Sequence, residues 1–207
     1  MPELSNLVAY GLISLGMVLT PGPNMIYLIS RSICQGRMAG LISLGGVALG
    51  FVVYMLCAAL GITALVLAVP YAYDALRLGG ALYLLYLAWQ AVKPGGRSPF
   101  QVRDLPQDGP RKLFMMGFVT NMLNPKVAVM YLSLLPQFID PTSHGSVLTQ
   151  SLVLGFTQIV ISVSVNSVIA IMAGSIASFL ANRPMWQIVQ RWLMGTVLAG
   201  LAVRMAL

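Results

Sequence analysis

One lysine and four asparagines lie within stretches that are otherwise apolar, and their side chains could bind a charged ligand: Lys126, Asn24, Asn121, Asn124 and Asn166. Lys126 is the charged residue nearest the middle of such a stretch, where a charge costs about 2.5–3.5 kcal/mol on membrane-insertion scales. It must therefore face a cavity or a partner, and its ammonium group suits a carboxylate. Asparagine oxygens, in turn, accept hydrogen bonds from an ammonium group. Two structural alternatives remain: Lys126 neutralised by backbone carbonyls or by water, and Asn166 in an interhelical hydrogen bond.

Most of these residues flank breaks in the apolar stretches. The segment Thr20–Asn24 (Thr-Pro-Gly-Pro-Asn) interrupts the run 4–30, and the segment Asn121–Lys126 (Asn-Met-Leu-Asn-Pro-Lys) interrupts the run 113–135. Proline lacks an N–H group and breaks a helix, and carbonyls freed in lipid must be covered by protein or by a wet cavity. Each following half-helix offers unpaired N–H groups and a positive dipole end, which suits an anion. Two such breaks indicate a transporter site, the alternative being proline kinks that serve packing only.

The elements that position these residues are predicted to be membrane-spanning helices. The 207-residue chain is 58% hydrophobic and only 8% charged, whereas soluble domains carry about 25% charged residues. Because a crossing needs roughly 20 apolar residues, six spans are predicted, at about 4–30, 40–66, 75–92, 113–135, 147–180 and 186–206. The fifth is too long for a straight crossing, so it must tilt, bend or extend from the bilayer. The sequence therefore predicts an all-α polytopic membrane protein with one transmembrane domain over residues 1–207.

The loops carry an uneven distribution of charge. Basic residues gather in the first, third and fifth loops, at Arg31, Arg37, Lys93, Arg97, Arg103, Arg111, Lys112 and Arg183. Because cytoplasmic loops carry an excess of Lys and Arg, we expect these loops in the cytoplasm and both termini in the periplasm.

The two halves of the chain, about 1–92 and 113–207, echo each other across the predicted cytoplasmic linker 93–112. Pro23-Asn24 precedes a Leu-Gly-Phe sequence at 49–51, and Pro125-Lys126 precedes another at 154–156. Because each half has three spans, the copies must have opposite topology. The sequence thus predicts two inverted three-helix repeats, with helices 1 and 4 broken. A GxxxG pattern at Gly46 and Gly50 favours close helix packing within the chain, with a homodimer seam as the alternative.

Taken together, these motifs resemble those of the LysE/RhtB family over essentially the whole chain. The resemblance rests on the Thr-Pro-Gly-Pro-Asn element, the small-residue-rich second span, the stretch 82–89 (Leu-Tyr-Leu-Leu-Tyr-Leu-Ala-Trp) and the Asn-Pro-Lys at 124–126. The homoserine/threonine-type branch looks closest. The resemblance implies a bacterial inner-membrane exporter of amino acids and related metabolites that is energised by the proton gradient. It also implies a central site containing Pro21, Gly22, Pro23, Asn24, Asn124, Pro125 and Lys126.

No acidic residue lies deep in a predicted span, because Glu3, Asp74, Asp104, Asp108 and Asp140 are terminal or in loops. A dibasic substrate would want a counter-carboxylate, and a divalent metal would want carboxylate, imidazole or thiolate ligands. We therefore expect a small neutral amino acid, such as homoserine or threonine, in a protein embedded in the lipid bilayer. Neither a metal nor a cofactor is expected. The net charge of +7 follows from the loop bias and does not indicate nucleic-acid binding.

Other functions stay open at this point. A passive channel, or an exporter of another small metabolite, would share these features. A membrane thiol oxidoreductase needs a cysteine pair near a break, but Cys34 and Cys57 lie in neither break. A serine–lysine hydrolase would pair Lys126 with Ser162 or Ser164, yet nothing in their spacing selects a serine. We therefore expect a transporter and not an enzyme.

Overall fold

The computed structural model describes residues 2–68, 107–142 and 145–181 continuously, with isolated residues between 71 and 93 and between 185 and 203. All regular elements in these ranges are helices. By length and composition, two described helices could each cross a membrane, and two bent pairs could serve as two more spans. The chain is thus an all-helical, polytopic membrane protein. The third and sixth predicted spans lie outside the continuous ranges, although Gly195 of the sixth lies against Val92 and Ala88 of the third.

The first predicted span is a broken helix, as expected. Helix α1 (Leu4–Leu19) and helix α2 (Pro23–Gln35) meet at an angle of 51°. Helix α1 ends at Thr20, whose backbone is extended, because Pro21 follows it and has no N–H group to continue the hydrogen-bond ladder. Helix α2 starts on Pro23, a position where the missing N–H group costs nothing.

The fourth predicted span is also broken, with the same bend of 51°. Helix α5 (Pro110–Met122) ends before Asn124, and helix α6 (Pro125–Val129) follows. The chain then continues through a π-helical turn η1 (Met130–Leu134) and a 3-10 turn η2 (Leu135–Phe138). Asn124 caps α6, because its Oδ1 accepts the backbone N–H of Lys126 at 3.1 Å. Both predicted breaks are confirmed, and the inverted relation between the halves stays a prediction.

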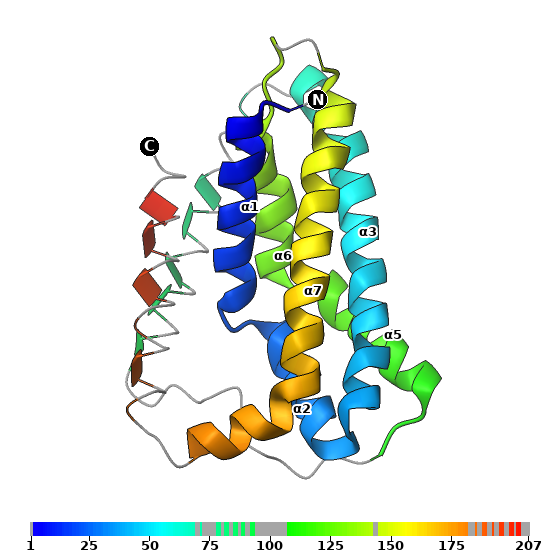
Figure 1. Cartoon of the computed structure of the whole chain (residues 1–207). Coiled ribbons are helices and arrows are strands. Elements are labelled where there is room, and N and C mark those ends of the chain that lie inside the picture. The colour runs from blue at the N-terminus through cyan, green and yellow to red at the C-terminus, as the bar shows by residue number, and fades with distance from the viewer. Residues whose placement is uncertain are drawn as a thin grey trace.

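The second and fifth predicted spans are long helices, α3 (Arg37–Ala68) and α7 (Val147–Ala181). Gly36 separates α2 from α3 with a φ of 84°, a conformation that favours glycine. Helix α7 begins after Ser146, whose Oγ accepts the backbone N–H of Thr149 at 3.1 Å. Figure 1 shows the last turns of α7 turned away from the axis of the rest of that helix.

Small residues bring α3 and α5 into close contact. A Cβ atom on Gly46 would overlap the backbone carbonyl oxygen of Phe114, and one on Gly117 would overlap that of Ser43. Gly50 lies against the side chain of Asn121 in the same way. The Gly46 and Gly50 pattern therefore serves packing within the chain, which is the use that the sequence favoured.

The described connections gather at two ends of the molecule. Figure 1 shows the N-terminus and the connection between η2 and α7 at one end. The junction of α2 with α3, the start of α5 and the end of α7 lie at the opposite end. The described loops thus group as the charge pattern predicts. Between these ends the two breaks lie near the middle of the helices, where α7 crosses α1 and α2 (Figure 1).

Candidate functional site

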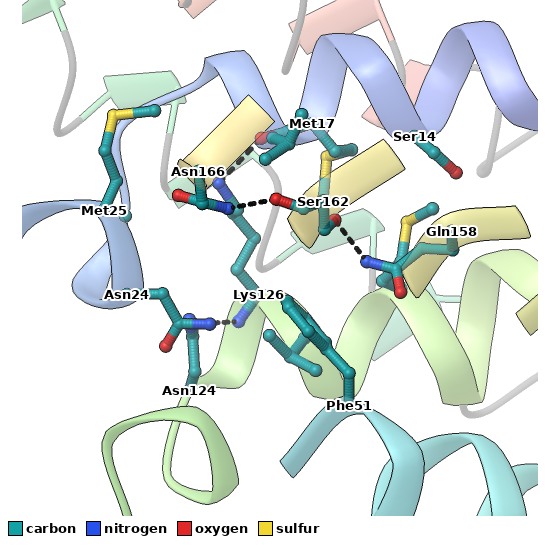
Figure 2. Close-up of a pocket in the computed structure, with 14 residues that line it drawn as sticks. Ser14, Met17, Asn24, Met25, Phe51, Asn124, Lys126, Gln158, Ser162 and Asn166 are labelled. Carbon is teal, nitrogen blue, oxygen red and sulfur yellow. Dashed lines mark hydrogen bonds between the residues drawn. The ribbon is translucent and has the colours of Figure 1, made fainter. Parts of the chain in front are cut away.

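A central cavity lies where the two helix breaks meet α7 (Figure 2). Its volume is about 30 Å³, which leaves room for about two water molecules. Six segments supply its wall: the end of α1, the first break with the start of α2, the second break with the start of α6, the π turn, α3 and α7. The lining residues are Ser14, Met17, Val18, Gly22, Asn24, Met25, Phe51, Asn124, Lys126, Val127, Met130, Gln158, Ser162 and Asn166.

Lys126 joins the second break to the first. Its Nζ donates hydrogen bonds to the backbone carbonyl oxygens of Met17, at 2.7 Å, and of Thr20, at 2.6 Å. Both carbonyls belong to the end of α1, where the break leaves carbonyl groups without the usual helical partner. In a continuous helix the carbonyl of Met17 would accept from residue 21, which is a proline. The ammonium group therefore compensates the negative end of the α1 dipole, and this is the structural role that the sequence left open for this lysine.

Three cavity asparagines play two different parts. Asn124 caps α6 through its Oδ1. By contrast, the Oδ1 atoms of Asn24 and Asn166 are buried and have no hydrogen-bond partner. Their residues are only 6% and 3% exposed, and both residues line the cavity (Figure 2). Water in the cavity, or a ligand with N–H donors, could satisfy these acceptors.

A row of polar residues on α7 lines the cavity, and the sequence interpretation did not assemble it. Gln158, Ser162 and Asn166 repeat every four residues, so they share one helix face. Gln158 donates from Nε2 to Ser162 Oγ at 2.8 Å, and Asn166 donates from Nδ2 to the Ser162 carbonyl at 2.8 Å. Tyr131, from the π turn, donates to Gln158 Oε1 at 2.5 Å. The spacing of four in an apolar helix was a signal that could have found this row.

The predicted site residues are partly brought together. Gly22, Asn24, Asn124, Lys126 and Asn166 line the cavity. Pro21, Pro23 and Pro125 shape the breaks without lining it, and Asn121 lies fully buried against Gly50 of α3. The sequence interpretation omitted the apolar wall, formed by Met17, Val18, Met25, Phe51, Val127 and Met130.

A second polar cluster lies at the end of the molecule that carries the α2–α3 junction. Asp108 accepts from Arg31 of α2 at 2.7 Å and from Lys112 of α5 at 2.5 Å. The hydrogen bond from Lys112, with the positive charges of Lys112 and Arg31, holds the pKa of Asp108 below its usual value near 3.8. Gln35 also donates from Nε2 to the Asp108 carbonyl at 3.1 Å. The cluster thus ties the end of α2 to the start of α5.

Comparison with known proteins gives a family and several relatives. The family described as LysE type translocator matches residues 15–207. A leucine efflux protein of Enterobacter sp. (strain 638) is 28% identical over 200 residues, covering 92% of this chain and 90% of the relative. The leucine efflux proteins of Salmonella typhimurium (strain LT2) and Salmonella typhi are each 27% identical over 195 residues, covering 92% of this chain and 89% of theirs. No solved structure matches the chain significantly.

Proposed function

The chain belongs to the LysE type translocator family, and on that premise we propose that it exports neutral amino acids across a bacterial inner membrane through its central cavity. The observation that carries this proposal is the combination of groups around that cavity. A fixed ammonium group, two unpartnered amide oxygens and an apolar wall meet between two broken helices. An amino-acid zwitterion has a carboxylate, an ammonium group and a side chain that match these three features.

Acceptors for a substrate ammonium group include the Oδ1 atoms of Asn24 and Asn166, which have no hydrogen-bond partner within the protein. A substrate carboxylate would have two kinds of donor. The first is the ammonium group of Lys126, which has three N–H donors and binds the carbonyls of α1 in this structure. The start of α2, where Gly22 provides no side-chain cap, adds backbone N–H groups and the positive end of a dipole.

The wall of the cavity supports a neutral, aliphatic side chain. Six apolar residues line it, and no acidic residue does, so a second positive charge on the substrate would remain uncompensated. Leucine is the first substrate to test, because the relatives in Enterobacter and Salmonella are named as leucine efflux proteins. Homoserine and threonine are the next, because the hydroxyl and amide groups of Ser162 and Gln158 could bind a substrate hydroxyl.

The cavity in this structure is narrow. A cavity of about 30 Å³ is far smaller than the roughly 300 Å³ or more of typical ligand pockets. Export therefore requires the broken helices to move and to widen the cavity. We further propose that the proton gradient drives this cycle.

Export from loaded cells tests the proposed function. Cells that express the protein are fed dipeptides, and the amino acids released are measured against cells that lack it. We expect release of leucine, homoserine or threonine to exceed that of lysine and arginine at equal internal concentration. Faster export of lysine or arginine would contradict the argument from cavity charge.

Counterflow in proteoliposomes tests the coupling and separates a transporter from a passive channel. Without substrate on the opposite side, a coupled exporter should accumulate labelled amino acid only when a pH gradient is imposed. With unlabelled substrate on the opposite side, it should exchange the label. Equal flux with and without the gradient, and no exchange, would indicate a channel.

A further inference from the structure

We propose that the Lys126 ammonium group occupies, in this structure, the place that the ammonium group of the transported amino acid takes during export. This inference rests on the proposed function and extends it to the order of events at the site. In this scheme Lys126 is a tethered competitor of the substrate. It holds the broken end of α1 until a ligand replaces it.

The carbonyl groups that hold Lys126 suit any ammonium group. Nζ donates to the carbonyl oxygens of Met17 and Thr20 at 2.7 and 2.6 Å. These carbonyls lie at the negative end of α1, so they favour a cation. The ammonium groups of lysine and of an α-amino acid are alike, with one positive charge and three N–H donors. A site that binds one therefore suits the other.

Lys126 and a bound amino acid cannot both occupy this place. The cavity of about 30 Å³ is too small for an amino acid while the lysine is in place. A Cβ atom on Gly22 would lie 3.2 Å from Nζ and 3.4 Å from Cε, so the lysine stem runs along the backbone of the first break. Two ammonium groups on the same carbonyls would also repel each other strongly in a low dielectric. The ligand and the lysine therefore exclude each other from this place.

After displacement, Lys126 needs a new partner for its charge. A buried charge needs a partner, and a zwitterion brings one, because its carboxylate can receive the ammonium group of Lys126. The unpartnered Oδ1 atoms of Asn24 and Asn166 lie beside the cavity and can complete the hydrogen bonds of the entering ammonium group. A ligand with an ammonium group alone would displace Lys126 and leave it unpaired. A ligand with a carboxylate alone could not replace it on α1.

Binding to the purified protein tests this exchange. The probes are leucine, 3-methylbutylamine, which lacks the carboxylate, and 4-methylpentanoate, which lacks the ammonium group. We expect the natural protein to bind leucine at least tenfold more tightly than either fragment. In Lys126→Met the carbonyls of Met17 and Thr20 lose their ammonium donor, so the affinity for the amine should rise at least tenfold while that for leucine falls at least tenfold. Lys112→Met, which removes an exposed lysine outside the cavity, is the matched control and should bind like the natural protein.

A change in folding does not weaken the test. If Lys126→Met is unstable, 3-methylbutylamine should raise its unfolding temperature by several degrees and should not raise that of the natural protein. No gain of amine binding and no stabilisation by the amine, in both Lys126→Met and Lys126→Ala, would overturn the proposed exchange. If the natural protein binds none of leucine, homoserine and threonine, the proposed substrate class is wrong, whereas the amine measurements still decide where Lys126 acts.

Discussion

At the residue scale, the central cavity depends on the absence of a side chain at Gly22. The backbone of Gly22 is extended, with φ −150° and ψ 179°, so other residues can adopt it. A Cβ atom there would lie 3.2 Å from Lys126 Nζ, a tight contact that the lysine would have to yield to by a few tenths of an ångström. We expect Gly22→Ala to fold normally and to bind leucine about tenfold more weakly, or about 1.4 kcal/mol. Binding to the purified variant measures this. Gly61→Ala, where a Cβ atom meets open space, is the control, and equal affinity in the two variants would contradict the crowding argument.

Two buried asparagines allow a matched comparison at the same scale. Asn24 and Asn121 both have unpartnered polar atoms, but only Asn24 lines the cavity. We expect Asn24→Ala to lose at least tenfold in export with little change in unfolding temperature, because its Oδ1 makes no hydrogen bond within the protein. Asn121→Ala should keep its export. The measurement is export per molecule of inserted protein, and equal losses in both variants would remove the cavity from the explanation.

At the element scale, the break between α1 and α2 creates acceptors as well as a bend. Pro21 cannot donate to the carbonyl of Met17, and Pro23 cannot donate to that of Leu19. With Pro21→Ala and Pro23→Ala together, we expect the helix to continue and its own N–H groups to reach the carbonyls that Lys126 now binds. The double variant should insert normally and lose most of its export. Pro110→Ala, at the first residue of α5, is the control. Unchanged export by the double variant would reduce the break to a packing feature.

The cluster around Asp108 makes a second prediction about elements, because it joins α2 to α5. The lowered pKa of Asp108 means that the folded protein binds this proton more weakly than the unfolded chain. The stabilisation is therefore complete above the ordinary pKa near 3.8 and is lost as the pH falls through the lower folded value. We expect Asp108→Asn to unfold at a lower temperature than the natural protein at neutral pH, and this difference should shrink below about pH 4.

Glu3→Gln, at an exposed position, is the control for Asp108→Asn. A difference that is constant with pH would show that the charge is not responsible.

At the scale of the whole molecule, the prediction concerns orientation. Gln107 and Thr142 are exposed, and they lie in connections at opposite ends of the molecule (Figure 1). Single cysteines at these positions, with Cys34 and Cys57 replaced by serine, can be labelled in intact cells with a membrane-impermeant reagent from the periplasm. Because the positive loops are expected in the cytoplasm, position 142 should react and position 107 should not. Labelling at position 107 alone would reverse the orientation.

The sequence by itself determined the features that depend on local chemistry. Proline at 21 and 125 lacks an N–H group wherever the chain folds, so both breaks were predictable. Hydropathy likewise located α3 and α7, because transfer into lipid depends on each residue in turn. The predicted span 147–180 agrees closely with α7 at Val147–Ala181. The mid-span position of Lys126 also predicted that it must face a cavity or a partner.

The tertiary structure decided which groups meet. Lys126 finds its partners at Met17 and Thr20, more than a hundred residues earlier in the chain, and no local pattern identifies them. Helix packing also places Asn121 against Gly50, away from the cavity, and places Gln158 and Ser162 at the cavity. All three are polar residues in apolar helices, so the sequence does not distinguish them. The physical reason is that a helix presents each side chain in a fixed direction, but what lies in that direction depends on how distant helices pack.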